Sequence, residues 1–212
     1  MIVEITPPAW YPFHDDADEI VRMEVTSVGV WTFVVVNGMP TYYVSVEQAD
    51  KTITIDGKVF HPWEVPSGKV EEFEDMPEQT GSREFAEEIG VDVDQTALKF
   101  LSVIMATGSA SLLYYTLIDL AKLELKNPVT QDDGTLVYEP NSRVDQGEIS
   151  RIALIPIGLI DSDSSLLNKY TSHKRKTGLG IRAVLQKAWV ETSAVDYVRD
   201  AILNMRAQAA GS

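Results

Sequence analysis

One acidic segment, residues 71–92, restricts what this chain can fold into more than any other feature. It holds nine Asp or Glu residues and a single basic residue, Arg83. Within it, Pro77 suits the first turn of a helix, and Gly90 suits the left-handed position that follows a helix. The spacing therefore predicts a helix over residues 77–89. Any fold of the chain must supply the carboxylates of this segment with solvent or with cations.

The predicted helix has an acidic face. Glu84, Glu87 and Glu88 follow the i, i+3, i+4 rule and fall on one side, while the apolar residues of the segment occupy the adjacent side and can bury against a sheet. Three clustered carboxylates repel one another unless a cation neutralises them, and Mg²⁺ prefers carboxylate oxygens. Arg83 lies four residues before Glu87 and can orient that carboxylate. Taken alone, a solvated acidic face is the alternative interpretation.

The chain on either side of this segment is patterned mainly as β-strands. Strands are expected at residues 30–36, 41–46, 52–55, 58–61, 98–105, 112–118 and 149–155, with hairpin turns at Asn37-Gly38 and Asp56-Gly57. Residues 126–145 are polar and contain proline, so we expect a long loop there with a short strand at 136–138. Two further helices are expected at about residues 180–190 and 193–208. This order predicts an α+β fold, an α/β/α sandwich with a mixed β-sheet between helices.

The domain organisation follows from the same patterns. Residues 1–27, which contain three prolines and three aromatic residues, are expected to form an N-terminal arm. Residues 28–160 form the predicted main domain, and residues 161–212 are expected to form a C-terminal helical extension packed on it. A chain of 212 residues suits one domain with additional elements.

Composition excludes several classes of function. The chain has no cysteine, which rules out disulfides, thiolate metal sites and a cysteine nucleophile. Its net charge of −14 argues against a sequence-independent grip on nucleic-acid phosphates. No basic stretch followed by an apolar one opens the sequence, and the longest apolar run, residues 28–36, is too short to span a membrane. We therefore expect a cytoplasmic location and no membrane partner.

The second half of the acidic segment contains a recognisable sequence motif. Residues 83–91, Arg-Glu-Phe-Ala-Glu-Glu-Ile-Gly-Val, fit every fixed position of the second half of the Nudix box. In the first half, Gly68 and Glu74 have the family spacing, but eight residues instead of seven separate Glu74 from Arg83. Asp75 would restore the spacing with a shorter acid, so neither acid is assigned a role. The chain resembles the Nudix hydrolase family over about residues 28–160.

The resemblance implies a Mg²⁺-dependent pyrophosphohydrolase, with Mn²⁺ as a substitute ion. It makes Glu84 and Glu88 direct metal ligands, with Glu87 assisting through a ligand or a bound water. A backbone carbonyl from the turn before the box glycine points to Ser67 as a further ligand. Several branches of the family use a glutamate on a later loop as general base, which points to Glu148. A solvated loop acid is the alternative interpretation of Glu148.

The turn at residues 63–71 resembles the corresponding segment of ADP-ribose and ADP-sugar pyrophosphatases. The resemblance favours a nucleoside diphosphate linked to a sugar or a similar group as the small-molecule substrate. Thr107 stands where that branch carries a proline, and Leu112 where it carries a glutamate. Four aromatic residues are candidates for stacking on a base, with core or sheet packing as the alternative: Trp10, Tyr42, Tyr43 and Trp63.

Two other functions are known on this fold and are the alternatives for this chain. A Nudix-like transcriptional regulator would place a DNA-binding segment at the C-terminus, where residues 157–212 hold eight Lys or Arg against five Asp or Glu. Against it stand the complete acids of the box and the absence of a winged-hairpin pattern. An isoprenoid diphosphate isomerase would need a cysteine, which the chain lacks. The related pyrophosphatases often pair through their N-terminal segments, so a homodimer is expected.

Overall fold

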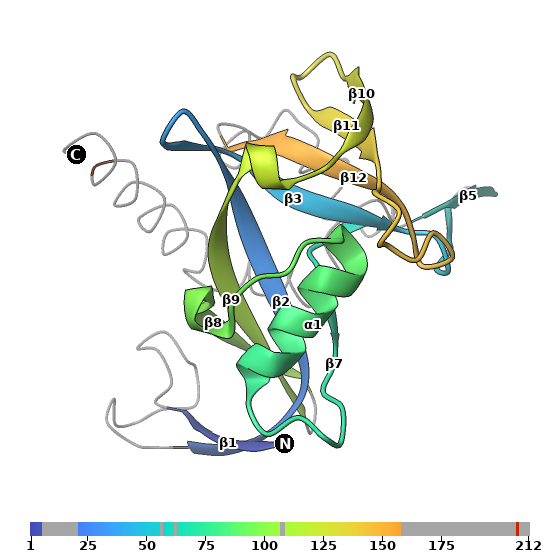
Figure 1. Cartoon of the computed structure of the whole chain (residues 1–212). Coiled ribbons are helices and arrows are strands. Elements are labelled where there is room, and N and C mark those ends of the chain that lie inside the picture. The colour runs from blue at the N-terminus through green and yellow to red at the C-terminus, as the bar shows by residue number, and fades with distance from the viewer. Residues whose placement is uncertain (6–20, 56, 62, 107–108, 158–206, 208–212) are drawn as a thin grey trace.

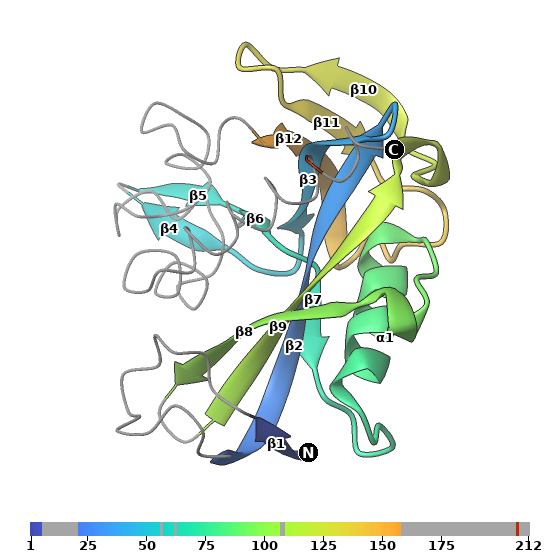
Figure 2. The ribbon, with the colours of Figure 1, turned by 90° about the vertical axis from the view of Figure 1, so that its left-hand side faces the viewer.

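The computed structural model describes residues 1–5, 21–55, 57–61, 63–106, 109–157 and 207. The two helices expected after residue 180, most of the N-terminal arm, Trp10 and Thr107 lie outside these residues. The described part consists mainly of a large twisted sheet with one α-helix on one face (Figures 1 and 2).

The sheet is built around one long strand, β2 (Val21–Val36). It pairs antiparallel with β3 (Met39–Gln48) and parallel with β9 (Ser109–Asp119), so the sheet is mixed, as predicted. Along the sheet the order is β10-β11-β12-β3-β2-β9-β8. The other strands on this path are β8 (Lys99–Ala106), β10 (Lys126–Thr130), β11 (Leu136–Glu139) and β12 (Ile149–Pro156).

Three short strands extend this sheet, and two form a separate hairpin. The short ones are β1 (Ile2–Ile5) and β7 (Ser67–Lys69), which pair with β2, and β6 (Trp63–Glu64), which pairs with β3. The separate hairpin joins β4 (Ile53–Ile55) to β5 (Lys58–Phe60). Both predicted hairpin turns are confirmed, with positive φ angles of 51° at Asn37, 79° at Gly38 and 77° at Gly57.

The helix α1 (Pro77–Ile89) has the predicted bounds. At its start, Gln79 Oε1 accepts hydrogen bonds from the backbone N–H groups of Asp75 at 2.7 Å and Met76 at 3.2 Å. At its end, Gly90 adopts a left-handed φ of 77° and donates its N–H to Ala86 O at 2.9 Å. Two 3₁₀ turns, η1 (Gln95–Ala97) and η2 (Leu120–Lys122), connect other elements.

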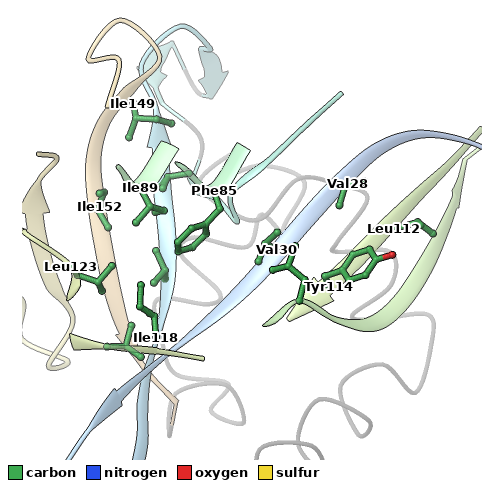
Figure 3. Close-up of a cluster of buried hydrophobic side chains, with 14 of the residues drawn as sticks. Val28, Val30, Phe85, Ile89, Leu112, Tyr114, Ile118, Leu123, Ile149 and Ile152 are labelled. Atoms are coloured by element: carbon green, nitrogen blue, oxygen red, sulfur yellow. The ribbon is translucent and has the colours of Figure 1, made fainter. Parts of the chain in front are cut away.

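The apolar face of α1 forms the core with the sheet. Phe85 and Ile89 are fully buried and point toward the strands (Figure 3). The strand residues of this cluster include Val28 and Val30 of β2 and Ile152 of β12. Burial of each large apolar side chain contributes about 1.5–3 kcal/mol, so this contact fixes α1 on the sheet. It thereby also fixes the direction in which the acidic face of α1 points.

One expectation is corrected. The short strand expected at residues 136–138 is present as β11, but the segment 126–145 is not a long loop, because β10 and β11 form a hairpin around Gly134 (φ 83°), and β11 pairs with β12. All five residues of β10 are exposed, so the alternating apolar pattern of a half-buried strand is absent there. The strand β2 runs across residues 27 and 28, and its first residues, 21–24, pair with β1. The division of the chain into an arm, a domain and a C-terminal extension stays a prediction.

Candidate active site

The acidic face of α1 meets the short strand β7 at Gly68. A Cβ atom on Gly68 would lie 1.9 Å from Glu84 Oε1, so the Glu84 carboxylate fills the space that a side chain at Gly68 would need. The Glu84 side chain is only 13% exposed. The glycine of the box is therefore required here for close approach and not for an unusual backbone angle.

Glu88 links three elements of the fold. Its residue is 5% exposed, and its Oε2 accepts a hydrogen bond from the Ser67 backbone N–H at 2.9 Å. Its Oε1 accepts from Gln48 Nε2, at the end of β3, also at 2.9 Å. Gln48 Oε1 in turn accepts from Lys51 Nζ at 2.8 Å. The structure thus brings the predicted Ser67 and Glu88 together and adds Gln48 and Lys51 to them.

Glu87 is the exposed member of the acidic face. Its side chain is 52% exposed, and its Oε2 accepts from Arg83 Nη1 at 3.0 Å. The predicted pairing of Arg83 with the residue four positions later is confirmed. The same Arg83 nitrogen donates to Glu84 Oε1 at 2.7 Å. Glu84 and Glu87 are therefore bridged by one guanidinium group.

The acid in the first half of the box is Glu74. Arg83 Nε donates to Glu74 Oε1 at 2.9 Å, and the Glu74 side chain is 3% exposed. Its Oε2 accepts from Thr80 Oγ1 at 2.7 Å and from the Glu71 backbone N–H at 2.8 Å. Asp75, the other candidate, is exposed. Of the two acids, Glu74 is therefore the one that binds Arg83 in a buried network, and the role of either acid in catalysis stays open to test.

Burial dominates the protonation of Glu88. Removal from water raises the pKa of the Glu88 carboxyl to about 8, although the hydrogen bonds from Gln48 and Ser67 act in the opposite direction. The negative charges of Glu84 and Glu64 raise it further. A nearby cation would act against these effects and favour the charged form of Glu88.

Glu148 lies next to this acidic group. It is exposed and immediately precedes β12, and its backbone carbonyl accepts a hydrogen bond from the Ala49 N–H at 2.6 Å. Burial raises the pKa of Glu84 despite the opposing Arg83, and the charges of Glu87 and Glu148 raise it further. The predicted base is thus placed within electrostatic reach of the acidic face, and its role stays a prediction.

Sequence reasoning missed three polar residues of this site. Gln48 is 2% exposed and continues the buried register of Val44 and Val46 on β3, so a polar residue at that position was a usable signal. Glu64 is 2% exposed, and its negative charge is one of those that raise the pKa of Glu88. Lys51 Nζ lies 3.7 Å from Glu64 Oε2. Together they add one amide, one carboxylate and one ammonium group.

The chemistry of these donors fits a hard divalent cation such as Mg²⁺. In the present side-chain arrangement, no group of three or more His, Asp or Glu side chains in the described part of the chain could hold a metal ion. Arg83 engages the Glu84 carboxylate, and Ser67 and Gln48 engage Glu88. Rotation of Glu84 toward a cation would leave Arg83 with Glu74 and the Lys69 carbonyl, which accepts from Nη2 at 2.8 Å.

Two of the aromatic candidates for base stacking are packed inside. Tyr43 is 1% exposed and Trp63 is 3% exposed, so neither ring presents a face to solvent. Tyr42 is half-buried. The packing alternative therefore holds for Tyr43 and Trp63.

The part of the chain that the structure describes contains no helix with the length and apolar character that a membrane span requires.

Comparison with known proteins identifies the class. The NUDIX domain family matches residues 27–137, just over half of the chain. The chain therefore belongs to the NUDIX family, and by class it is a pyrophosphohydrolase. A comparison with the curated proteins gives no match.

Three solved structures illustrate the similarity of fold. The NUDIX domain of Shewanella oneidensis NrtR in complex with ADP ribose has 14% identity and a TM-score of 0.47, over 84% of this chain and 88% of its own. The Bacillus subtilis pyrophosphohydrolase BsRppH has 16% identity and a TM-score of 0.44, over 94% and 90%. A C. elegans Ap4A hydrolase has 14% identity and a TM-score of 0.43, over 85% and 98%. The family assignment rests on the domain match.

Proposed function

We propose that this protein hydrolyses a diphosphate bond in a nucleoside diphosphate linked to another moiety, of the ADP-ribose or nucleotide-sugar type, with Mg²⁺. One observation carries the proposal. The low-exposure carboxylates of Glu84 and Glu88 converge on the turn at Ser67 and Gly68, with further acids beside them. Mutual repulsion and burial make such a group costly without a cation.

Metal binding and the orientation of the metal ligands would fall to different residues. Glu84 and Glu88 would hold the cation together with the Ser67 carbonyl, and Glu87 would assist them. Arg83, anchored by Glu74, would orient Glu84 and Glu87. When bound, Mg²⁺ would supply charge neutralisation for the diphosphate oxygens and a lower pKa for the attacking water.

The chemical step is a displacement at phosphorus. The water oxygen forms a bond to one phosphorus of the diphosphate, and the bond from that phosphorus to the bridging oxygen breaks. The bridging oxygen leaves with the other phosphate, so two phosphate monoesters form. Glu148 takes the proton of the water as general base.

The preference among diphosphates comes from the turn at residues 63–71, which resembles that of ADP-ribose and ADP-sugar pyrophosphatases. The test is a phosphate-release screen with Mg²⁺ over ADP-ribose, nucleotide sugars, dinucleotide polyphosphates and nucleoside triphosphates. We expect turnover of the first two groups. If the protein hydrolyses none of the four groups of substrates and binds a promoter-DNA library, the result would support the regulator instead.

Three variants separate the metal site from general effects of charge. Glu84→Gln and Glu88→Gln should fold and lose turnover by orders of magnitude, because each removes a proposed ligand. The exposed Glu72 of the same acidic segment offers the control variant Glu72→Gln, which should retain activity. Mn²⁺ binding followed by electron paramagnetic resonance provides a readout besides activity. Equal Mn²⁺ affinity in all three variants would contradict the proposed ligands.

The homodimer and the cytoplasmic location expected from the sequence stay predictions. Light scattering of the purified protein tests the first, and cell fractionation tests the second. A monomer at micromolar concentration would overturn the dimer without affecting the proposed chemistry.

A further inference from the structure

The loop between β11 and β12 is fastened to the C-terminal end of α1 (Figure 1). Asn141, in this loop, is 3% exposed. Its Nδ2 donates to the carbonyl oxygens of Ile89 and Gly90, each at 3.4 Å. The last carbonyls of a helix have no partner within the helix, so Asn141 satisfies groups that α1 leaves open.

Gly90 and Asn141 fit each other closely. A Cβ atom on Gly90 would lie 2.3 Å from Asn141 Oδ1, and the φ of 77° at Gly90 also favours glycine. The final glycine of the box thus both ends α1 and leaves room for the Asn141 amide. A side chain at position 90 would push the loop away from the helix.

The rest of the loop is held by its own hydrogen bonds. Asn141 Oδ1 accepts from the Arg143 N–H at 2.9 Å, and Val144, which is 4% exposed, packs into the core. Further along, the Glu148 N–H donates to Asp145 O at 3.0 Å. The Glu148 carbonyl accepts from Ala49 at the end of β3. The loop therefore runs between two fixed ends.

Both ends of the loop are linked to residues of the candidate active site. At one end, Asn141 contacts the last turn of α1, which carries Glu88. At the other end, Glu148 precedes Ile149, whose partner across the sheet is Gln48, and Gln48 donates to Glu88. The position of Glu148 relative to the acidic face is therefore determined by how this loop is attached.

We propose that Asn141 is a positioning residue that sets the place of Glu148 relative to the acidic face of α1, by binding the last carbonyls of that helix. The inference rests on the proposed function, in which Glu148 receives the proton of the attacking water. Misplacement of a reacting group by about 1 Å can cost on the order of 100-fold in rate.

The chain offers a matched control in the same loop. Arg143 Nη2 donates to both carboxylate oxygens of Asp92, at 2.9 and 3.0 Å, and so joins the same loop to the residues that follow α1. These side chains are 55% and 77% exposed. An exposed ion pair contributes little because solvent screens it. Arg143→Ala therefore removes a second tie between the same two segments without opening the buried one.

The experiment is a double-mutant cycle with the full-length protein. We expect Asn141→Ala to lower kcat roughly 10- to 100-fold, with KM unchanged within about twofold. Arg143→Ala should stay within about twofold of the wild-type kcat. In a Glu148→Gln background, Asn141→Ala should cause almost no further loss, because the group that it positions has lost its function. Mn²⁺ affinity, measured by electron paramagnetic resonance, should be equal with and without the Asn141 substitution.

Several results would overturn the inference. These are an equal loss of kcat in both backgrounds, a parallel fall in Mn²⁺ affinity, or an equal loss in Arg143→Ala. Should Asn141→Ala fail to fold, Asn141→Ser takes its place in the cycle, since its hydroxyl can still accept from the Arg143 N–H two residues later but is one atom shorter than the amide that donates to the helix carbonyls. A wild-type protein that hydrolyses no diphosphate overturns the proposed function. An active protein whose Glu148→Gln variant is equally active overturns the role of Glu148 as general base, and with it the role of the loop, but leaves the proposed hydrolysis standing.

Discussion

Arg83 Nε lies 2.9 Å from Glu74 Oε1, and this ion pair ties the turn before α1 to the middle of the helix. Glu74 also accepts hydrogen bonds from Thr80 and from the Glu71 backbone. The guanidinium that Glu74 anchors is the one that contacts Glu84 and Glu87. Its pKa stays above the ordinary value for arginine because, although burial acts against the charge, the bonds to Glu74 and Glu84 outweigh it. The upstream acid therefore acts on the proposed metal ligands through Arg83.

Glu74→Gln should destabilise the protein by about 2 kcal/mol, because a charged hydrogen-bond acceptor is removed from a buried network. This loss of stability is smaller than the loss expected if Arg83 had no other partner. Arg83 still donates to Glu84 and to the Lys69 carbonyl in the variant. Asp75→Asn, at the exposed neighbouring acid, is the control and should change the free energy of unfolding by less than about 0.5 kcal/mol. Urea unfolding measures both. Equal effects of the two substitutions would show that the pairing with Arg83 carries no stability.

The contribution of Glu74 should depend on pH in a defined direction. Burial acts to raise the pKa of Glu74, but the hydrogen bonds from Arg83, Glu71 and Thr80 outweigh it and hold the pKa below its ordinary value of 4.5. A carboxyl with a lowered folded-state pKa adds stability above its unfolded value, and that stability is lost as the pH falls through the folded value. The difference in unfolding free energy between wild type and Glu74→Gln should be constant at neutral pH and shrink below pH 4.5. A difference that stays constant down to pH 3 would contradict this.

Gly68→Ala should fold but lose metal binding. The atoms that its Cβ would meet belong to the far end of the flexible Glu84 side chain, which can move away without disturbing the backbone. The displaced carboxylate should weaken Mn²⁺ binding roughly tenfold or more, and turnover with it. Gly29→Ala is the matched control, since Gly29 pairs with Ser67 and its Cβ would meet Leu113, Ser67 and Val65 at 3.4–3.5 Å, an ordinary contact distance. Loss of Mn²⁺ affinity in both variants would point to a general packing effect.

Gln48→Leu should weaken Mg²⁺ binding by roughly tenfold, because Gln48 Nε2 orients Glu88 Oε1 and supporting residues of metal ligands typically have effects of that size. Lys51→Met tests whether the effect passes through the ammonium group. It removes the donor to Gln48 Oε1 but keeps the amide contact to Glu88, so a smaller change is expected. Isothermal titration calorimetry with Mg²⁺ measures both variants. A larger loss in Lys51→Met than in Gln48→Leu would assign the effect to charge and not to orientation.

Local patterns predicted the parts of the fold that depend on neighbours in the sequence. The helix at residues 77–89 and the turns at Asn37-Gly38 and Gly57 have the expected places, because capping and positive φ angles are properties of a few adjacent residues. Of the β10–β11 hairpin, the strand expected at residues 136–138 is present as β11, whereas β10 was missed because it is exposed along its whole length. The pairing of β10 with β11 places it in the sheet.

The same division holds for the site. The sequence by itself determined that Glu84, Glu87 and Glu88 share a helix face and that Arg83 pairs with Glu87, because helical geometry places residues three and four apart together. Tertiary structure decided that Glu74 and not Asp75 binds Arg83, that Gln48 and Ser67 hold Glu88, and that Asn141 meets the end of α1. Apart from the pair of Glu74 and Arg83, these contacts join residues 21 to 52 positions apart. Their separation in space is set by strand pairing and by packing of α1 on the sheet, which no local spacing encodes.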